Sequence, residues 1–422
     1  MQNFRTAKAA AYITNISMSA VATISPLLFS TFYTHYGISY SLLGLLVLVN
    51  FCTQLAIDLI FSFYSHKFNL KLTIRIMPVL TAVGFAVYAT LPMLFPQAAY
   101  WGLVAGTMIF ALSGGLAEVL ISPLIAAMPS EHPEREMSKL HSVYAWGVVA
   151  IVLASSGILY LIGKENWYWL ALGLTAIPVV AAGLFFFAPM PEMETPQKTS
   201  GAVKLFTDKS LILCILCIFF GGASENIMSQ WCSGYLEQAL GISKLLGDIF
   251  GVAMFAFMLG LGRTIYALCG KSIYRFLIAG ACGAIVCYVV AAVTSLPVLG
   301  LIACALTGFC TSMLWPGSLI ATSDFFPHAN VAVFALMAAG GDLGASVGPQ
   351  LIGLIADAII LNPDAAGLAS SLQLTVEQLG MKAGVLFAAI FPVLAAVCFG
   401  ILYKLSKKKK AVLLNGTESK LQ

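Results

Sequence analysis

Three acidic residues lie inside long apolar stretches of this sequence, where an ionisable side chain is costly and marks a candidate functional position. Glu118 lies in FALSGGLAEVLISPLIAAM, Glu225 in FFGGASENIMSQW and Asp342 in MAAGGDLGASVGPQLIG. None has a basic residue within a helical turn on its own segment, and no Lys or Arg is expected at the same depth. A low-dielectric environment favours the neutral form of a carboxyl group, which can then take up a proton on one side and release it on the other.

The three acids therefore predict binding of a proton or of a polar solute. The alternative is that each is a neutral carboxyl group hydrogen-bonded to a neighbouring helix. Four further acids, at the predicted ends of apolar stretches, are better explained by solvation or helix capping: Asp58, Asp324, Asp357 and Glu237.

Polar side chains recur every four residues in the apolar stretches, and residues four apart share one face of a helix. We interpret these stripes as the lining of a cavity. Their members are Asn15 and Ser19, Asn50 and Gln54, Asn226 and Gln230, and Asp342 and Ser346. Gly340, Gly344 and Gly348 follow the same spacing on another face, which predicts close packing of helices.

Aromatic residues accompany these stripes: Tyr144, Trp146, Trp231 and Trp315. Flat aromatic faces beside amide, carboxyl and hydroxyl groups suit a neutral polyhydroxylated ligand such as a sugar, whose C–H faces stack while its hydroxyls form hydrogen bonds. An aromatic belt at the membrane surface is the alternative for residues of this type.

Motifs of catalysis are absent from the sequence. It has no Gly-rich phosphate loop followed by Lys-Ser/Thr, no HExxH and no GxSxG. Cys214 and Cys217 have CxxC spacing, but they lie in an apolar run with no second CxxC. We therefore predict that the protein is not an enzyme, has no cofactor or metal site, and binds no nucleic acid.

The elements that must position these residues are membrane-spanning helices. Of 422 residues, 60% are hydrophobic and 9% are charged, whereas soluble domains carry roughly 25% charged residues. A bilayer needs about 20 apolar residues per helix, and continuous apolar runs argue against a β-barrel. Twelve such segments are predicted, near 9–31, 40–64, 74–95, 100–128, 139–162, 167–188, 211–234, 246–269, 274–293, 297–320, 331–358 and 382–404.

The distribution of basic residues predicts the orientation. With both termini in the cytoplasm, 19 Lys and Arg residues fall on the cytoplasmic side, and three fall outside: Lys164, Lys244 and Lys382. This positive-inside bias predicts a multi-pass protein of the inner or plasma membrane. The predicted division is an N-terminal six-helix bundle (1–188), a central cytoplasmic loop (189–209), a C-terminal six-helix bundle (210–405) and a basic, disordered cytoplasmic tail (406–422).

The sequence resembles the major facilitator superfamily, and more narrowly its fucose/glucose–proton symporter branch. The resemblance lies in Gly114 to Glu118 followed by Ser122-Pro123-Leu124, in Ser224-Glu225 with Trp231, Tyr235-Leu236-Glu237 and Gly241-Ile242-Ser243, in Trp315-Pro316, and in Gly344, Gly348-Pro349 and Gly353 to Asp357. It implies two pseudo-symmetric six-helix bundles, a central cavity, and sugar uptake driven by protons, with Glu118 as a substrate or proton residue. One departure is Ala22, Thr23 and Ser25 ahead of Pro26, where sugar–proton members can carry an acid.

The combined prediction is a monomeric all-α transporter that moves a small neutral polar solute, a sugar, across the bilayer by alternating access with proton symport. Two alternatives stay open: efflux of amphipathic compounds, and a membrane sensor of the same fold that does not transport.

Overall fold

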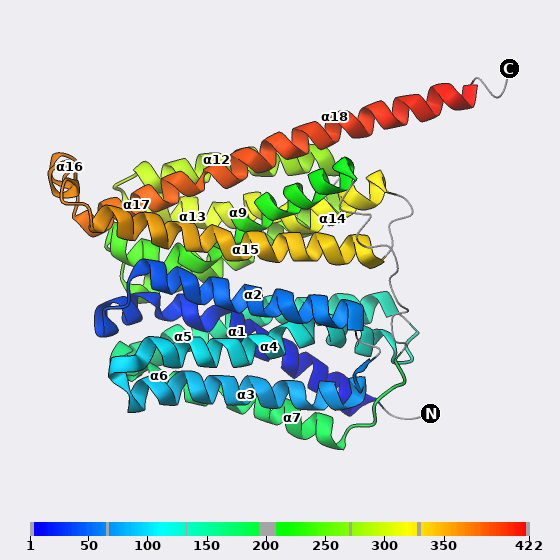
Figure 1. Ribbon diagram of the computed structural model, residues 1–422, viewed down its shortest axis with the longest axis horizontal. Coiled ribbons are helices and arrows are strands. Elements are labelled where there is room, and N and C mark those ends of the chain that lie inside the picture. The colour runs from blue at the N-terminus through cyan, green and yellow to red at the C-terminus, as the bar shows by residue number, and fades with distance from the viewer. Residues whose placement is uncertain are drawn as a thin grey trace.

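The computed structural model describes residues 4–64, 67–131, 133–193, 208–269, 272–326 and 331–418. Twelve of its helical segments are long and apolar enough to cross a membrane, as predicted. They form two packed bundles, the first built from α1 to α7 and the second from α9 to α18 (Figure 1). The protein therefore has the predicted all-α membrane fold.

The helices follow the predicted apolar stretches closely, with most ends within a few residues. In the first half they are α1 (Arg5–Tyr36), α2 (Tyr40–Tyr64), α3 (Leu70–Leu94), η2 (Pro96–Ala98), α4 (Ala99–Ala126), α5 (Pro133–Ile162), η3 (Lys164–Asn166), α6 (Trp167–Leu174) and α7 (Ala176–Phe187). In the second half they are α9 (Lys209–Leu240), α10 (Lys244–Leu246), η4 (Gly247–Ala253), α11 (Met254–Cys269), α12 (Ile273–Val293), α13 (Pro297–Thr311), α14 (Leu314–Phe325), α15 (Val331–Ile360), α16 (Ala365–Ser371), α17 (Val376–Ala388) and α18 (Ile390–Glu418).

One expectation about the C-terminal tail is corrected. Residues 406–418 continue α18 as a helix that projects beyond the bundle, so this part of the basic tail is not disordered (Figure 1). Residues 194–207 of the central loop and 419–422 of the tail lie outside the described residues.

Proline explains where predicted spans are interrupted. The breaks between α6 and α7, α13 and α14, and α17 and α18 each lie three or four residues before a proline: Pro178, Pro316 and Pro392. Proline lacks the N–H that would bond the carbonyl four residues earlier, and its ring crowds that carbonyl. Pro26, Pro123 and Pro349 lie inside unbroken helices, so packing decides whether the helix is interrupted.

The first helix of each bundle ends in the same way. Gly37 follows α1 with φ +64° and Gly241 follows α9 with φ +66°, a left-handed conformation that glycine adopts without steric cost. The next helix then begins at Tyr40 in the first half and at Lys244 in the second. The two halves therefore repeat a turn as well as a helix count.

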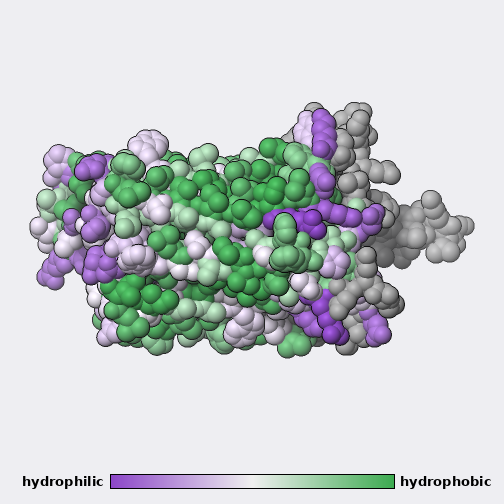
Figure 2. Space-filling view, turned by 90° about the horizontal axis from the view of Figure 1, so that it is seen from below, coloured by the Kyte–Doolittle hydropathy of each residue, from purple (hydrophilic) through white to green (hydrophobic). Residues whose placement is uncertain are grey.

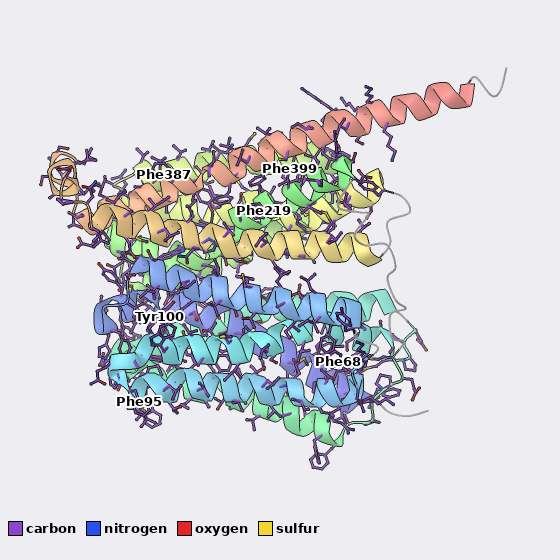
Figure 3. All side chains as sticks on the ribbon, in the orientation of Figure 1. Phe68, Phe95, Tyr100, Phe219, Phe387 and Phe399 are labelled. Atoms are coloured by element: carbon purple, nitrogen blue, oxygen red, sulfur yellow. The ribbon has the colours of Figure 1, made fainter. Side chains whose placement is uncertain are left out.

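The surface of the molecule matches a bilayer environment. Apolar side chains cover a broad band between two polar ends (Figure 2). Exposed aromatic side chains such as Phe95 (58% exposed) and Phe387 (62%) lie on the periphery, whereas Phe399 is fully buried (Figure 3). Lipid chains can cover the exposed band without a hydrophobic penalty.

The two ends of the molecule differ in how the bundles meet. We call the end that carries the start of α1 and the end of α18 the termini end, and the opposite end, which carries α16, the far end (Figure 1). At the far end Asp357 accepts hydrogen bonds from the backbone N–H groups of Tyr40 (3.1 Å) and Ser41 (2.7 Å) across the interface. The capping role predicted for Asp357 is confirmed.

Further contacts close the far end. Lys164 forms an ion pair with Glu237 of the other bundle. The Trp231 ring packs against Phe29, with the ring centroids 5.0 Å apart, and against Tyr40, 5.9 Å away. Together these contacts join α1, α2 and the α5–α6 connection to α9 and α15.

A buried ionic group completes this closure. Lys244 and Asp248 form an ion pair at 7% and 0% exposure, so Lys244 does not lie in an outer loop as predicted. Ser233 bonds both side chains, and Ser156 of the first bundle donates to Asp248 at 2.7 Å. Lys382, also predicted in an outer loop, is buried in α17 and donates to the carbonyls of Ala292 and Thr294 at the end of α12.

Removing one member of this group leaves the other charge buried and unpaired. We expect Lys244→Met to destabilise the protein by about 3–5 kcal/mol, whereas an apolar replacement of both partners is close to neutral. The melting temperature in detergent should therefore fall for Lys244→Met and recover in Lys244→Met with Asp248→Leu. Equal melting temperatures for wild type and Lys244→Met would contradict the buried pair.

Candidate functional site

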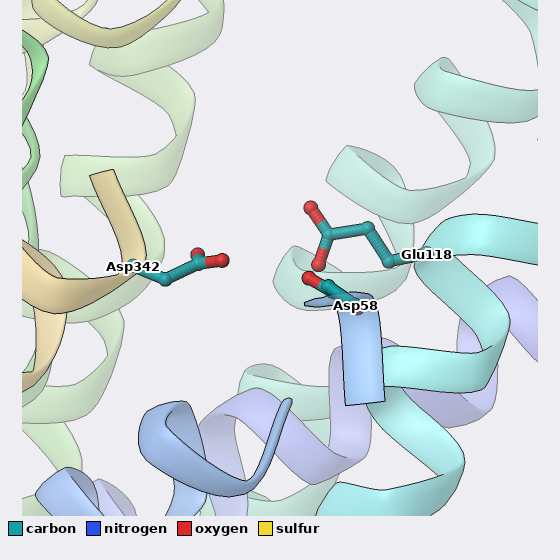
Figure 4. A group of neighbouring side chains, drawn as sticks. All are labelled: Asp58, Glu118 and Asp342. Carbon is teal, nitrogen blue, oxygen red and sulfur yellow. The ribbon is translucent and has the colours of Figure 1, made fainter. Parts of the chain in front are cut away.

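Three carboxylates meet between the bundles. Asp58 of α2, Glu118 of α4 and Asp342 of α15 each present an oxygen, and these oxygens all lie within 4.8 Å of one another. Their side chains point toward a common centre, two from the first bundle and one from the second (Figure 4). Asp342 is 5% exposed, whereas Glu118 is exposed although it lies eight residues inside α4. The cluster therefore borders a space that solvent reaches.

Glycines bring the helices of the cluster together. A Cβ on Gly115 would lie 2.8 Å from the Gln54 carbonyl oxygen and 3.1 Å from Asp58 Oδ1, so only glycine lets α2 approach α4 here. On α15, Gly344 packs against the Phe219 backbone and Gly348 against Ile227, both on α9. The packing role predicted for the α15 glycines is confirmed.

The structure corrects the prediction for Asp58, which the sequence assigns to solvation or capping at a span end. Asp58 lies six residues before the end of α2 at Tyr64, and its carboxylate meets Glu118 and Asp342 between the bundles, so neither solvation nor capping at a span end explains it. The sequence carries the signal: Asn50, Gln54 and Asp58 are spaced by four and share one face. Asp324's side chain lies outside the described residues.

The structure also corrects the prediction that no basic residue lies at the depth of Glu225. Arg263, one of the 19 basic residues assigned to the cytoplasmic side, lies inside α11, and its Nη2 is 3.3 Å from Glu225 Oε1. Its Nε donates to the Ser312 carbonyl at 3.0 Å. That carbonyl is the one Pro316 cannot bond, so the proline creates the acceptor that holds the arginine. Glu225 is therefore a paired carboxylate.

Tyr144 faces the same space as the acids. It is 38% exposed and close enough to Glu118, Glu225 and Arg263 to interact with their charges. Asn15 and Ser19 of α1 instead bond the backbone of α5, to the carbonyls of Leu140 and Tyr144, both at 2.9 Å. Both hydrogen bonds tie α1 to α5, and the one from Ser19 holds the backbone of Tyr144.

The remaining predicted residues of α9 and α15 are mostly buried or bonded to backbone carbonyls. On α9, Asn226 donates to the Gly222 carbonyl, Gln230 is 6% exposed, and Trp231 is buried and donates to the Pro349 carbonyl at 2.9 Å. On α15, Ser346 is buried and donates to the Asp342 carbonyl.

Trp315 and Trp146 have different surroundings. The Trp315 ring packs directly over Gly222 and Gly341. A Cβ on either glycine would lie within 3 Å of the ring, so only glycine leaves room for it. Trp146 is 66% exposed and lines a cavity of about 560 Å³ between α1 and α5, with Tyr12, Ile16 and Val143. Trp146 is therefore not brought together with the acids.

Electrostatics make the cluster a receptor for positive charge. Two ionised carboxylates 4.8 Å apart repel by about 3.5 kcal/mol at an effective dielectric of roughly 20. Among the described residues, no basic side chain pairs with Asp58, Glu118 or Asp342. Asn50 Oδ1 and Gln350 Oε1, on the facing helices α2 and α15, are also buried without a hydrogen-bond donor.

The model of the family described as the Major Facilitator Superfamily matches residues 10–349. This chain belongs to the major facilitator superfamily. No relative was found among the curated proteins.

Solved structures of superfamily transporters share the fold. A bacterial homolog of the human lysosomal transporter Spinster, inward-facing and unoccupied, gives a TM-score of 0.77 at 14% identity, covering 97% of this chain and 98% of that one. A D-xylose–proton symporter gives 0.69 at 15%, covering 92% and 96%. The E. coli fucose:proton symporter gives 0.57 at 12%, covering 95% and 99%.

An ionic group at the termini end ties α1 to α5 in this superfamily member. Glu136 accepts from Lys8 (2.8 Å), Tyr12 (3.0 Å) and Lys139 (3.2 Å). The hydrogen bond from Lys8, followed by those from Lys139 and Tyr12, lowers the pKa of Glu136 from 4.5 to about 2. This group lies beside the cavity that contains Trp146.

The lowered pKa predicts an acid-dependent loss of stability. The contribution is fully present above the ordinary pKa of 4.5 and is lost as the pH falls toward 2. The melting temperature in detergent should fall less over this range in Glu136→Gln than in wild type. Glu192→Gln, which removes a carboxylate with 97% exposure, is the matched control and should behave like wild type. Identical curves for wild type and Glu136→Gln would contradict the assignment.

Proposed function

We propose that this protein is a secondary transporter that carries a small neutral polar solute, a sugar, across the cell membrane together with protons. It works as a monomer by alternating access between two bundles, residues 1–188 and 210–405. Both termini and the connection between the bundles lie in the cytoplasm, in accordance with the predicted excess of basic residues on that side.

The observation that carries this proposal is the convergence of acids from both bundles on a solvent-accessible space. Asp58 and Glu118 belong to the first bundle and Asp342 to the second, with oxygens within 4.8 Å. A proton that binds here changes the repulsion across the interface between the bundles. Proton binding and the relative position of the bundles are therefore energetically linked.

The groups around the acids support a neutral, hydroxyl-rich solute. Asn50 Oδ1 and Gln350 Oε1 accept no hydrogen bond from the described residues, and solute hydroxyls can satisfy them. Tyr144 and Trp315 offer aromatic surface for the apolar face of a sugar ring. The xylose–proton and fucose–proton symporters named above share the fold.

The contacts between the bundles support an inward-facing state. The ion pairs, helix cap and aromatic contacts that join the bundles at the far end close that side. Glu118 is exposed, so access comes from the termini end, which we place in the cytoplasm. Alternation requires the far-end contacts to break while the bundles close over the acids.

Uptake into proteoliposomes tests the coupling. A one-unit pH gradient stores about 1.4 kcal/mol per proton, enough for about tenfold accumulation of a co-transported solute. Wild type should accumulate a sugar from a panel of monosaccharides when a gradient is applied. Glu118→Gln cannot exchange the proton, so it should lose accumulation but retain exchange of labelled for unlabelled sugar.

Asp364→Asn, which changes an exposed acid next to α16, is the control and should transport like wild type. Undiminished gradient-driven accumulation by Glu118→Gln would rule out its role in coupling.

A second candidate function is efflux of amphipathic compounds. The cavity lined by Tyr12, Ile16, Val143 and Trp146 is mostly apolar and favours such ligands. Resistance to several unrelated amphipathic compounds on overexpression, abolished by Trp146→Ala and accompanied by no sugar uptake, would select this function over the first.

A further inference from the structure

We propose that Asp58, Glu118 and Asp342 form a binding site for a divalent metal cation of the size of Ca²⁺, held between the two bundles. The inference concerns the cluster of the proposed function but rests on that function only for its consequence in transport. The sequence alone predicts no metal site, because it assigns Asp58 to a span end and so leaves only two of the ligands at this depth.

The spacing of the ligands selects the size of the ion. An ion central to three oxygens no more than 4.8 Å apart lies within about 2.8 Å of each, close to the roughly 2.3–2.6 Å of Ca²⁺–oxygen bonds. Mg²⁺ requires bonds of about 2.0–2.1 Å in a near-ideal octahedron. The same three oxygens would have to move further inward to hold Mg²⁺, so Ca²⁺ is preferred.

A second observation points to a ligand at the centre of the cluster. Asp342 is 5% exposed and points at the other two carboxylates (Figure 4), yet its Oδ2 has no hydrogen-bond partner among the residues that the structure describes. Asp58 Oδ1 is likewise buried without a partner. Buried carboxylate oxygens are normally satisfied by donors or by a metal. A cation bound between the three carboxylates would supply a partner for this group of acids.

Charge also favours a divalent ion. Arg263, a basic residue of the same region, is engaged by Glu225 and the Ser312 carbonyl and does not reach the cluster. Carboxylate oxygens are hard ligands of the type that Ca²⁺ prefers over softer metals. One divalent ion with one proton neutralises three carboxyl groups, whereas a monovalent ion needs two protons.

The surroundings of Glu118 allow an ion to reach the site. Glu118 is an exposed residue, so a hydrated ion can approach through solvent and keep water molecules as further ligands. The ion would contact α2 and α4 on one side and α15 on the other. Separating the bundles at this level would remove Asp342 from the coordination shell, so the ion stabilises the arrangement in which they are close.

A direct measurement of metal binding tests the proposal without a transport assay. The full-length protein, purified in detergent and freed of metal, is titrated with ⁴⁵Ca²⁺ at neutral pH by equilibrium dialysis. One saturable site per chain is expected, with unlabelled Ca²⁺ competing at least about tenfold better than Mg²⁺ and with Na⁺ and K⁺ ineffective. Asp342→Asn and Asp58→Asn should each weaken binding at least about tenfold, which is one ligand's contribution.

Asp364→Asn makes the same chemical change at an exposed acid and should bind like wild type. A single elution peak in gel filtration and an unchanged helical circular-dichroism spectrum establish that each variant is folded. If a variant does not fold, the ion preference and the loss of wild-type binding at acid pH remain as tests. No saturable binding by wild type, or equal binding by Asp342→Asn and Asp364→Asn, would overturn the site.

This experiment separates the metal site from the proposed function. Calcium binding without sugar uptake supports the site and removes the transport assignment. Proton-driven sugar uptake without calcium binding overturns the site and retains the transporter.

Discussion

The cost of a charge in apolar surroundings is the constraint on which this structure depends. A buried charge needs a partner, a helix end or water. Lys244 and Asp248 satisfy each other with two serines, and Lys382 uses the carbonyls that end α12. Arg263 pairs with Glu225 and donates to the Ser312 carbonyl, which Pro316 leaves without its helical hydrogen bond. The carboxylate cluster differs. Within the described structure its acids are close to one another and to solvent, and no basic side chain pairs with them.

Close helix packing sets where these charges meet. Gly115 allows α2 to lie against α4 closely enough to bring Asp58 beside Glu118, and Gly344 seats α15 on α9. Neither contact survives a side chain larger than hydrogen without a shift of the backbone. The position of the acids thus follows from residues that have no chemistry of their own, and the glycines and the acids act as one unit.

The sequence predicts the fold better than the site, and the reasons are physical. Length and apolarity define spans locally, so twelve helices and most of their ends are predictable, including the cap role of Asp357. Side-chain partners depend on which helices pack together. The Arg263–Glu225 pair, the depth of Lys244 and Lys382, and the bonds of Asn15 to α5 require that packing. The membrane depth of Asp58 could be predicted from its four-residue spacing with Asn50 and Gln54. Its contact with Asp342 of the other bundle could not.

The two ends of the interface between the bundles differ in what they require. At the far end the hydrogen bonds of Asp248, Asp357 and Trp231 are made by the protein itself, so that side closes without a ligand. At the cluster, Asp342 Oδ2 and Asp58 Oδ1 have no hydrogen-bond partner in the part of the chain that the structure describes, so the approach of the bundles there depends on what binds. A ligand shifts a conformational equilibrium only by its difference in affinity between the two states. The far end is therefore held closed by contacts of the protein itself, whereas the energy of bringing the acids together depends on the proton or cation that binds them, so a ligand at the cluster changes the balance between the two ends of the interface.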